Sequence, residues 1–441
     1  MSLSNSPDIA PEASRGKIIA LADCNNFFVS CERLFRPDLK NRPVVVLSNN
    51  DGCVISRSNE AKALGIKMGV PFFQIADLAR RYRIAAFSSN FPLYLDISRR
   101  VTSTLEEFCP RLENYSVDES FLDLSGLDRL YDIPAYCLKI RETVTRNTGI
   151  PICVGAAATK TLAKAANHAA KKNFIPGGAA VILDEVTRRR VLKWTPVGDI
   201  WGVGSRLEPK IREILHAGDA WEFAECDEYR LRHNFNKTVY GTWKELNGES
   251  FFELEDQPRP KKQMMWSRTF GNRIADFGLL RETMAGFAVS IMQKLREERQ
   301  YAGTMGIFIS SSPFDPRPCS DSATLDLGYP VNDTVTVLNG LNFLLEKIFR
   351  PGVPYARGGI ILCDLSLTPE FQTDLFDPVK QPGPDDEKRK KLMATIDLIN
   401  SRGRNTIFFA AQGRAGTAKV SRQTRLSPAY TTSWKDVPKV R

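Results

Sequence analysis

The sequence predicts a multi-domain α+β protein, on three observations. The chain has 441 residues, more than a single domain usually contains. Between residues 261 and 368, strand-like and helix-like apolar patterns follow the order β-α-β-β-α-β, which is typical of a split βαβ sandwich. Before them, a long apolar strand, an acidic hairpin and an alanine-rich helix indicate a separate body with its own sheet.

Composition excludes several classes of protein. A hydrophobic fraction of 42% is that of a globular chain. We expect no membrane span, because no run of eighteen apolar residues is present. Nine scattered cysteines without a Cys-x-x-Cys pair argue against a disulfide framework or zinc site and favour a reducing cytoplasm. Residues 1–16 are rich in Ser and Pro, which predicts a disordered leader and not a signal peptide.

The positive charge is concentrated at the C-terminal end. The net charge is +10, and residues 380–441 contain fourteen Lys and Arg against five Asp and Glu. The rest of the chain is therefore close to neutral. A basic protein favours a polyanionic partner, and here a nucleic acid held by the main body must be held by local patches.

The first predicted element is a near-continuous apolar run from Lys17 to Phe28 that contains Asp23 near its end. Such a run is typical of a buried strand. The Asp can be the N-cap of the next helix, predicted over Val29–Leu34. It can also be a metal ligand at the edge of a sheet, and the strand by itself leaves both interpretations open.

A small α/β lobe is predicted next. Strands over Arg42–Leu47 and Cys53–Ile55 flank an Asn-Asn-Asp-Gly turn, and a helix follows over Ser58–Leu64. Its basic residues nearest the turn are Arg57 and Lys62. Taken alone, these two side chains are interpreted as a solvated helix surface.

The acidic hairpin is the most informative stretch. An amphipathic helix over Leu93–Phe108 leads into two short strands within Asn114–Ser125, with Asp118 and Glu119 at their tip. Adjacent carboxylates repel each other, and a bound Mg²⁺ would relieve that repulsion. Together with Asp23 they form the donor set of a two-metal site for phosphoryl displacement. The alternative is an acidic tip that points into water.

The segment after the hairpin continues the α/β pattern. A helix over Ala135–Thr148, a strand over Pro151–Gly155 and an alanine-rich helix over Ala157–Lys172 are predicted. The small side chains of the last helix allow it to lie close to a sheet. His168 on this helix is expected to serve packing and not to bind a ligand.

A glycine hairpin precedes the next helix, predicted over Arg206–Leu215. Backbone N–H groups at a helix N-terminus bind phosphate without sequence specificity. We interpret the hairpin as part of a helix-hairpin-helix motif, while an ordinary turn between helices is the alternative. The residues expected to contact DNA phosphate are Gly202, Val203, Gly204 and Ser205.

The remaining part of the chain is predicted as a second domain and a tail. A linker over Asp256–Pro260 leads to the split βαβ pattern, and order is expected to fall away after Pro369. Farther on, Leu392–Ile399 and Thr406–Ala410 suggest a small appended module with basic flanks. The stretch 381–391 has the composition of a disordered linker. Leu375 and Phe376 in a polar setting are typical of a peptide anchor for a partner's groove, and packing on the chain's own surface is the alternative.

Five motifs together resemble those of the Y-family translesion DNA polymerases, and among them the UmuC type, the catalytic subunit of bacterial DNA polymerase V. The resemblance covers essentially the whole chain after the leader. The motifs are Leu-Ala-Asp-Cys-Asn-Asn-Phe-Phe (21–28), Leu-Ser-Asn-Asn-Asp-Gly-Cys-Val-Ile-Ser-Arg (47–57), Glu-Ala-Lys-Ala-Leu-Gly (60–65), Tyr-Ser-Val-Asp-Glu-Ser (115–120) and Lys-Thr-Leu-Ala-Lys-Ala-Ala-Asn-His-Ala-Ala-Lys-Lys (160–172).

The resemblance implies a right-hand polymerase architecture with a ferredoxin-like palm, small fingers, a helical thumb and a βαββαβ little finger. The implied boundaries are a leader at 1–16, a palm at 17–34 and 91–185, fingers at 35–90, a thumb with the helix-hairpin-helix at 186–255, a little finger at 261–368, a linker with a clamp-binding motif at 369–390, and a basic C-terminal module at 391–441.

The resemblance also assigns roles at the catalytic centre. It implies that Asp23, Asp118 and Glu119 are the catalytic carboxylates and hold two Mg²⁺ ions. The backbone carbonyl of Cys24 is implied as a further metal ligand. Phe28 matches the steric-gate aromatic, whose ring would clash with a ribonucleotide 2′-hydroxyl.

Nucleotide contacts are implied for three basic residues of the motifs. They are Arg57, Lys62 and Lys171. The sequence departs from the family pattern nearby, since Asn59 stands near a position where many relatives carry Tyr.

The partners implied by the resemblance are primer-template DNA, a dNTP, a sliding clamp, a UmuD-type accessory subunit and a RecA-type filament. The clamp motif corresponds to Gln372, Leu375 and Phe376. The expected location is the cytoplasm, in association with the nucleoid.

The implied function is error-prone, template-directed addition of dNTPs to a primer 3′-OH in SOS-type damage tolerance. Two alternatives remain at this stage. Nucleotidyl cyclases also build two-metal carboxylate sites on similar sheets, but they need no DNA-holding hairpin or domain. A non-catalytic DNA-binding factor with an acidic tip is the other alternative.

Overall fold

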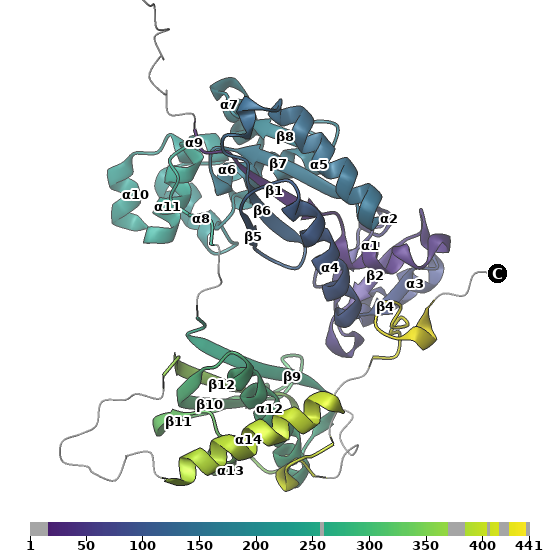
Figure 1. The fold of residues 1–441 in the computed structure, drawn as a ribbon, viewed down its shortest axis with the longest axis vertical. Helices are drawn as coiled ribbons and strands as arrows, with labels where there is room; N and C mark the ends of the chain where they lie inside the picture. Colours follow the sequence, from purple (N-terminus) through teal and green to yellow (C-terminus); the bar gives the residue numbers. More distant parts are fainter. Residues whose placement is uncertain (1–15, 256–259, 369–383, 404–405, 414–422, 438–441) are drawn as a thin grey trace, which may run out of the picture. The chain divides into compact units, whose positions relative to one another are not determined.

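The computed structural model describes residues 16–255, 260–368, 384–403, 406–413 and 423–437. The chain divides into two compact units (Figure 1). Unit 1 contains residues 1–46, 54–258 and 426–441, and unit 2 contains residues 47–53 and 259–425. Helices and sheets occur in both units, which confirms the predicted multi-domain α+β class.

The main sheet of unit 1 has five strands in the order β5-β6-β1-β7-β8. Its central strand β1 (Ile19–Cys24) is buried along its whole length, which explains its continuous apolar sequence. β1 is antiparallel to β6 and β7, while β8 is parallel to β7. The other strands are β5 (Leu112–Asn114), β6 (Glu119–Asp123), β7 (Ile152–Ala157) and β8 (Ala179–Ile182).

Helices cover both faces of this sheet, and alternate residues of β1 point to opposite sides. Ala20 and Ala22 belong to the core formed with three helices on one face, and Ile19 and Leu21 belong to the core formed with the alanine-rich helix on the other. The first face is covered by α1 (Phe27–Leu34), α4 (Phe91–Glu106) and α5 (Ile133–Thr148), and the second by α6 (Lys160–Lys171).

The small lobe contains a three-stranded sheet of order β3-β2-β4. The sequence predicts its first two strands and its first helix, but it does not predict β4 or α3, whose apolar residues are only partly buried. Its elements are β2 (Val44–Leu47), β3 (Val54–Arg57), α2 (Asn59–Ala63), α3 (Ala76–Arg81) and β4 (Ala85–Ser88).

A group of helices follows β8 and shares its apolar core with α6. Buried Glu245 ties this group to the α6 N-terminus, since its carboxylate accepts hydrogen bonds from the Thr161 backbone N–H and hydroxyl. It also accepts the backbone N–H groups of Phe251 and Phe252. The helices are α7 (Glu185–Trp194), α8 (Leu207–Leu215), α9 (Ala220–Ala224), α10 (Glu228–Asn234) and α11 (Lys237–Leu246).

Unit 2 is built on an antiparallel four-stranded sheet of order β11-β10-β12-β9. Two helices pack on it around a core of their own. The chain order is β-α-β-β-α-β, as the sequence predicts. The elements are β9 (Gln263–Ile274), α12 (Phe277–Glu297), β10 (Tyr301–Ser310), β11 (Ser320–Val331), α13 (Thr334–Ile348) and β12 (Tyr355–Ser366).

The prediction that 381–391 is disordered is wrong in its C-terminal part. α14 (Pro384–Arg402) begins inside that stretch and inside the predicted linker 369–390. Tertiary contacts stabilise this highly charged helix, because Met393 is buried and Asp397 forms a bidentate ion pair with Arg296 of α12 at 2.6 and 2.9 Å. Composition alone does not reveal such contacts.

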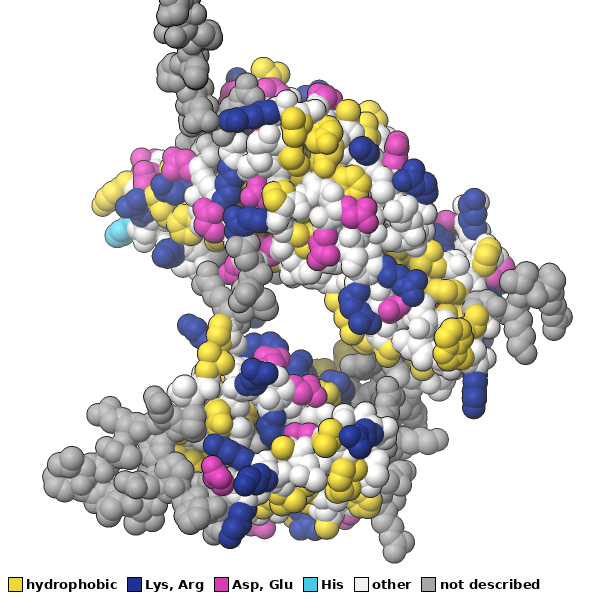
Figure 2. Space-filling view, in the orientation of Figure 1, with side chains coloured by type: hydrophobic (Ala, Val, Ile, Leu, Met, Phe, Trp, Pro, Cys, Tyr) yellow, Lys and Arg dark blue, Asp and Glu magenta, His cyan; other side chains and the backbone are white. Residues whose placement is uncertain are grey.

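The charged side chains of unit 1 are mixed in sign. Figure 2 shows Lys and Arg side chains interspersed with Asp and Glu side chains over the visible face of this unit. This agrees with the near-neutral composition of the chain before residue 380. Among the described residues, no helix is both long enough and apolar enough to cross a membrane.

We predict that Glu245→Ala lowers the free energy of unfolding by about 3 kcal/mol or more, because it leaves buried backbone N–H groups without an acceptor. Urea unfolding measures the change. Glu249→Ala is the matched control, since Glu249 lies on the surface and pairs with Lys244 at 2.7 Å, and its effect should stay within about 1 kcal/mol. Equal stabilities of the two variants would contradict the prediction.

Candidate active site

The pairing of β1 with β6 brings the predicted carboxylates together. Asp23 stands directly opposite Glu119 in the antiparallel register. Residues opposite each other across two strands point to the same face. The next residue of β1, Cys24, donates its backbone N–H to the backbone carbonyl of Asp118 at 2.8 Å. Residues about 95 positions apart in the chain are therefore neighbours at one end of the sheet.

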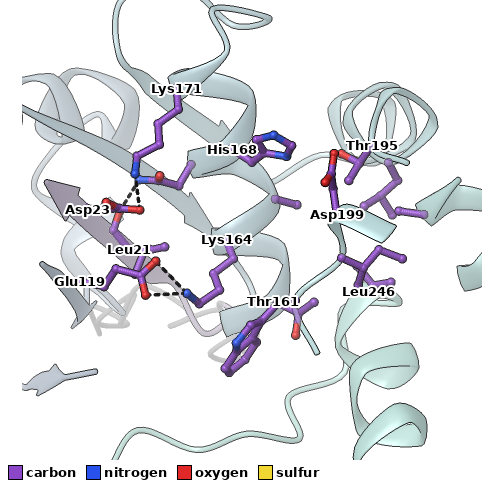
Figure 3. Close-up of a pocket in the computed structure, with 16 residues that line it drawn as sticks. Leu21, Asp23, Glu119, Thr161, Lys164, His168, Lys171, Thr195, Asp199 and Leu246 are labelled. Atoms are coloured by element: carbon purple, nitrogen blue, oxygen red, sulfur yellow. Dashed lines mark hydrogen bonds and ion pairs between the residues drawn. The ribbon is translucent and has the colours of Figure 1, made fainter. Parts of the chain in front are cut away.

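Asp23 is buried and forms an ion pair with Lys171 of α6 at 2.5 Å (Figure 3). Burial raises the pKa of Asp23 to about 6, although Lys171 acts to lower it and the nearby carboxylates of Glu119 and Asp118 raise it further. A carboxylate in such surroundings needs positive charge to remain ionised at neutral pH.

Glu119 is paired with a second lysine of the same helix. The Nζ atom of Lys164 lies 3.0 and 2.9 Å from the two carboxylate oxygens of Glu119 (Figure 3). Lys164 also lies over three aromatic rings, at 4.6 Å from the centroid of Tyr115, 5.7 Å from Phe121 and 5.4 Å from Trp201. These cation–π contacts hold the ammonium group close to the carboxylate.

The carboxylates have the chemistry of a magnesium site but are not gathered around a common point. Among the described residues, no three His, Cys, Asp or Glu side chains form a group close enough to hold a metal ion. Asp23 and Glu119 point to their lysine partners, and Asp118 accepts the hydroxyl of Ser116 at 2.6 Å. The donor set nevertheless fits a hard cation, because it offers several oxygen ligands at one end of the sheet.

A cavity of about 200 Å³ lies beside Asp118. The residues that line this cavity come from β1, α1, the small lobe and α6, which are far apart in the sequence. All three basic residues predicted to contact the nucleotide line it, together with the predicted gate residue. The lining includes Cys24, Phe28, Arg57, Lys62, Asp118 and Lys171. Lys171 also lines the cavity of about 290 Å³ on the Glu119 side that Figure 3 shows.

Two of the basic groups in this cavity are held in place by neutral partners. Lys62 donates to the side-chain oxygen of Asn26 at 2.6 Å, and Arg57 donates to the backbone carbonyl of Ile66 at 2.8 Å. The Nε atom of Arg57 is buried without a hydrogen-bond partner among the described residues. Burial lowers the pKa of Lys62, as do the charges of Arg57 and Lys171. An anion in the cavity would relieve this repulsion.

Phe28 lies on the first turn of α1 and packs against an aromatic side chain of α4. Its ring stacks on Tyr94 with a centroid distance of 4.6 Å and an interplanar angle of 16°. It also meets the edge of Phe91 at 5.9 Å. Tyr94 is fully buried, so the ring of Phe28 rests on a fixed support.

The glycine hairpin precedes α8 as predicted. Gly202 has a φ of +89°, which favours glycine, and Gly204 is exposed two residues later. The ring of His168 packs 5.3 Å from that of Trp194, in agreement with its expected packing role. The predicted clamp motif, Gln372 to Phe376, lies outside the described residues.

Sequence reasoning does not identify Lys164 or Tyr94, although the helix carries a signal for the first. Lys160, Lys164 and Lys171 are spaced at i, i+4 and i+11, which places them on one face of α6. Tyr94 has no such signal, because its importance comes from packing between two helices.

Two family models match most of the chain. A model described as the impB/mucB/samB family matches residues 22–168, and its C-terminal domain matches residues 261–375. Protein SamB of Salmonella typhimurium is 42% identical over 96% of this chain and 99% of its own length. The chain belongs to the impB/mucB/samB family. A further model, described as a domain of unknown function (DUF4113), matches residues 390–440.

Other members of the impB/mucB/samB family and more distant proteins agree with this assignment. Protein UmuC of Salmonella typhimurium is 41% identical over 96% of this chain and all of its own length. DNA polymerase IV of Treponema denticola is 25% identical over 89% of this chain and 95% of its own. These relatives confirm the resemblance inferred from the motifs.

A solved structure supports the same fold. A Y-family DNA polymerase chimera (Dbh-Dpo4(243-245)-Dbh) superposes with a TM-score of 0.62 at 20% identity, over 80% of this chain and all of that chain. The predicted right-hand polymerase architecture is therefore confirmed.

The position of α6, with both of its active-site lysines, depends on Gly155 of β7. A Cβ atom there would lie 2.1 Å from the backbone N of Asn167 and 2.5 Å from the backbone O of Ala163. We predict that Gly155→Ala lowers the free energy of unfolding by about 2–3 kcal/mol, as measured by urea unfolding.

Gly286→Ala is the control for this prediction. Gly286 lies inside α12, and a Cβ atom added there would meet no other atom within 4 Å. The substitution should leave stability unchanged or raise it by about 0.5–1 kcal/mol, because alanine favours a helix interior. A Gly155→Ala variant as stable as the parent would disprove the close approach of α6.

Proposed function

We propose that Asp23, Asp118 and Glu119 are the catalytic carboxylates of this family member, which is an error-prone translesion DNA polymerase. The reaction is the template-directed addition of a dNTP to a primer 3′-OH with release of pyrophosphate, in SOS-type damage tolerance. The observation that supports this assignment most strongly is the β1–β6 register, which pairs Asp23 with Glu119 next to the cavity that Asp118 lines.

The three carboxylates and the backbone carbonyl of Cys24 would hold two Mg²⁺ ions. When bound, such ions stabilise the attacking and leaving oxygens of an in-line phosphoryl displacement. Two lysines now pair with these carboxylates, Lys164 with Glu119 and Lys171 with Asp23, and the carboxylates would exchange these partners for the metal ions on binding.

The cavity beside Asp118 is proposed as the dNTP site. Arg57, Lys62 and Lys171 place three positive charges on its wall, which suits the triphosphate of a nucleotide. Phe28 lies on the same wall and is the proposed steric gate. Stacking on Tyr94 holds the ring of Phe28 in place, so a ribose 2′-hydroxyl would clash with a ring that cannot move aside.

Primer-template DNA is the proposed macromolecular substrate. Backbone N–H groups of Gly202, Gly204 and Ser205 precede α8 and are proposed to contact a DNA phosphate. The sequence also predicts Val203 as a contact, but its backbone N–H donates to the backbone carbonyl of Ile200 at 3.0 Å. We further propose a sliding clamp as partner through Gln372, Leu375 and Phe376. A UmuD-type subunit, a RecA-type filament and a cytoplasmic, nucleoid-associated location complete the proposal.

Asp118→Ala and Glu119→Ala are each expected to reduce primer extension by about 10³-fold or more, because the loss of a metal-anchoring carboxylate costs several kcal/mol at about 1.4 kcal/mol per tenfold change. DNA binding should persist. A primer-extension assay with Mg²⁺, together with a DNA-binding measurement, tests both statements.

Asp123→Ala is the matched control for the carboxylate variants. Asp123 lies on the same strand as Glu119 but at its other end, where its carboxylate accepts the backbone N–H of Ser125. This variant should extend primers at close to the parent rate. Extension by purified Asp118→Ala at the rate of the control would refute the assignment.

Phe28→Ala is expected to admit ribonucleotides, because the space taken by the ring becomes available to the 2′-hydroxyl. The measurement is the ratio of kcat/KM for a dNTP to that for the matching rNTP, and we expect it to fall by about tenfold or more. Phe73→Ala, which removes a largely exposed ring of the small lobe, should leave the ratio unchanged. Equal ratios for both variants would contradict the gate.

A further inference from the structure

The C-terminal end of the chain returns to unit 1. Residues 426–436, here called the C-terminal strap, belong to that unit, whereas α14 belongs to unit 2. In Figure 1 the strap is drawn in yellow beside the lobe that contains β4. The family model that matches this end of the chain carries no function in its description.

The first contact of the strap is a buried hydrogen-bond network. Ser427 is 6% exposed, and its hydroxyl donates to the Oε1 atom of Glu32 at 3.0 Å. The Asn90 side-chain amide donates to the Ser427 hydroxyl at 3.0 Å and also points to the backbone oxygens of Ser427 and Pro428 at 3.3 Å. Ser427 therefore joins α1, which carries Glu32, to the residue that caps α4.

The second contact is aromatic. The ring of Tyr430 stacks on that of Phe35 with a centroid distance of 4.5 Å and an interplanar angle of 12°. Phe35 is the C-cap residue of α1. The strap folds on itself here, because the backbone N–H of Ala429 donates to the carboxylate of Asp436 at 3.3 Å.

The strap shares a carboxylate with the support of the proposed gate. The same Oε1 atom of Glu32 accepts the hydroxyl of Tyr94 at 2.7 Å, and Tyr94 carries the stacked ring of Phe28. Glu32 is fully buried, and its Oε2 atom has no hydrogen-bond partner among the described residues. A buried carboxyl group depends on the few donors that it has, so the hydrogen bond from Ser427 matters for its position.

The spacing along both helices explains how the strap reaches the gate. Glu32 and Phe35 follow Phe28 by four and seven residues, which places all three on one face of α1. Asn90 precedes Tyr94 by four residues on α4. The strap therefore contacts each of the two helices one turn away from the stacked rings.

We propose that the C-terminal strap is a positioning element for Phe28, and that Ser427 and Tyr430 set sugar selectivity through Glu32 and Tyr94. The inference rests on the proposed gate function of Phe28. The strap holds α1 and α4 together through its contacts with Glu32 and Asn90. Its removal takes a donor from Glu32, uncovers Phe35, and frees the pair of rings to move away from the nucleotide sugar.

The test compares the dNTP to rNTP ratio of kcat/KM in primer extension by the full chain and by strap variants. Ser427→Ala removes the hydroxyl between Glu32 and Asn90, and Tyr430→Ala removes the stacked ring. Each should lower the ratio by about three- to tenfold, because a small displacement of a positioning group is sufficient to change selectivity. The loss should come mainly from faster rNTP incorporation.

Two further variants are expected to retain the parent ratio. Tyr430→Phe keeps the ring that stacks on Phe35. Trp434→Ala changes a strap residue that is 96% exposed. A chain that ends at Arg425 should lose selectivity as the point variants do, and a synthetic peptide of residues 426–441 added to it should restore the ratio.

The outcomes separate this inference from the function on which it rests. If the parent does not extend primers, or Phe28→Ala leaves the ratio unchanged, the proposed function fails. If Phe28→Ala changes the ratio but Ser427→Ala and Tyr430→Ala do not, the strap inference is overturned. Equal losses of dNTP and rNTP incorporation in the strap variants, with a lower thermal midpoint, would show a purely structural role and would also overturn it.

Discussion

The pairing register of β1 with β6 is the constraint on which the active-site arrangement depends. Side chains of a strand alternate between faces, so a slip of one residue would place Asp23 and Glu119 on opposite sides of the sheet. The apolar residues prevent such a slip. Leu21 and Phe121 are paired on the α6 face, and Ala20 is paired with Leu122 on the other. The core thus fixes the position of the polar residues at the strand ends.

Two lysines of α6 balance the negative charge of the carboxylates at this end of the sheet. α6 supplies Lys164 to Glu119 and Lys171 to Asp23. Because Gly155 lets this helix lie against β7 without a side chain between them, the lysines reach the carboxylates directly. Charge neutralisation and close packing are therefore two consequences of the same helix-to-sheet contact.

Short contiguous motifs explain why much of the site could be predicted from the sequence. Asp23 lies near the end of a buried run, and Asp118 and Glu119 lie in a hairpin, so local pattern marks them as candidates and the family resemblance assigns their roles. Their convergence with Arg57 and Lys62 around one cavity follows from the fold. The proposed contacts of these residues with metal and nucleotide remain predictions, since family resemblance suggests them and geometry is only compatible with them.

Other features could not be predicted because they depend on contacts between distant segments. The charged sequence of α14 indicates disorder, whereas its ion pair from Asp397 to Arg296 and its buried Met393 stabilise it as a packed helix. Lys164 acquires its role from three aromatic rings that come from β6, the loop before β6 and the segment before α8.

The strap is the extreme case of such long-range dependence. Ser427 lies 395 residues from Glu32 in the chain, and no pattern in a polar segment indicates a buried serine. The contact can form only when α1 and α4 are already packed, because it needs Glu32 from one helix and Asn90 from the other. Its free energy therefore favours the arrangement of these two helices over any in which they separate. The stacked rings of Phe28 and Tyr94 come from these two helices. A contact that stabilises the packing of α1 on α4 therefore also stabilises the stacked rings.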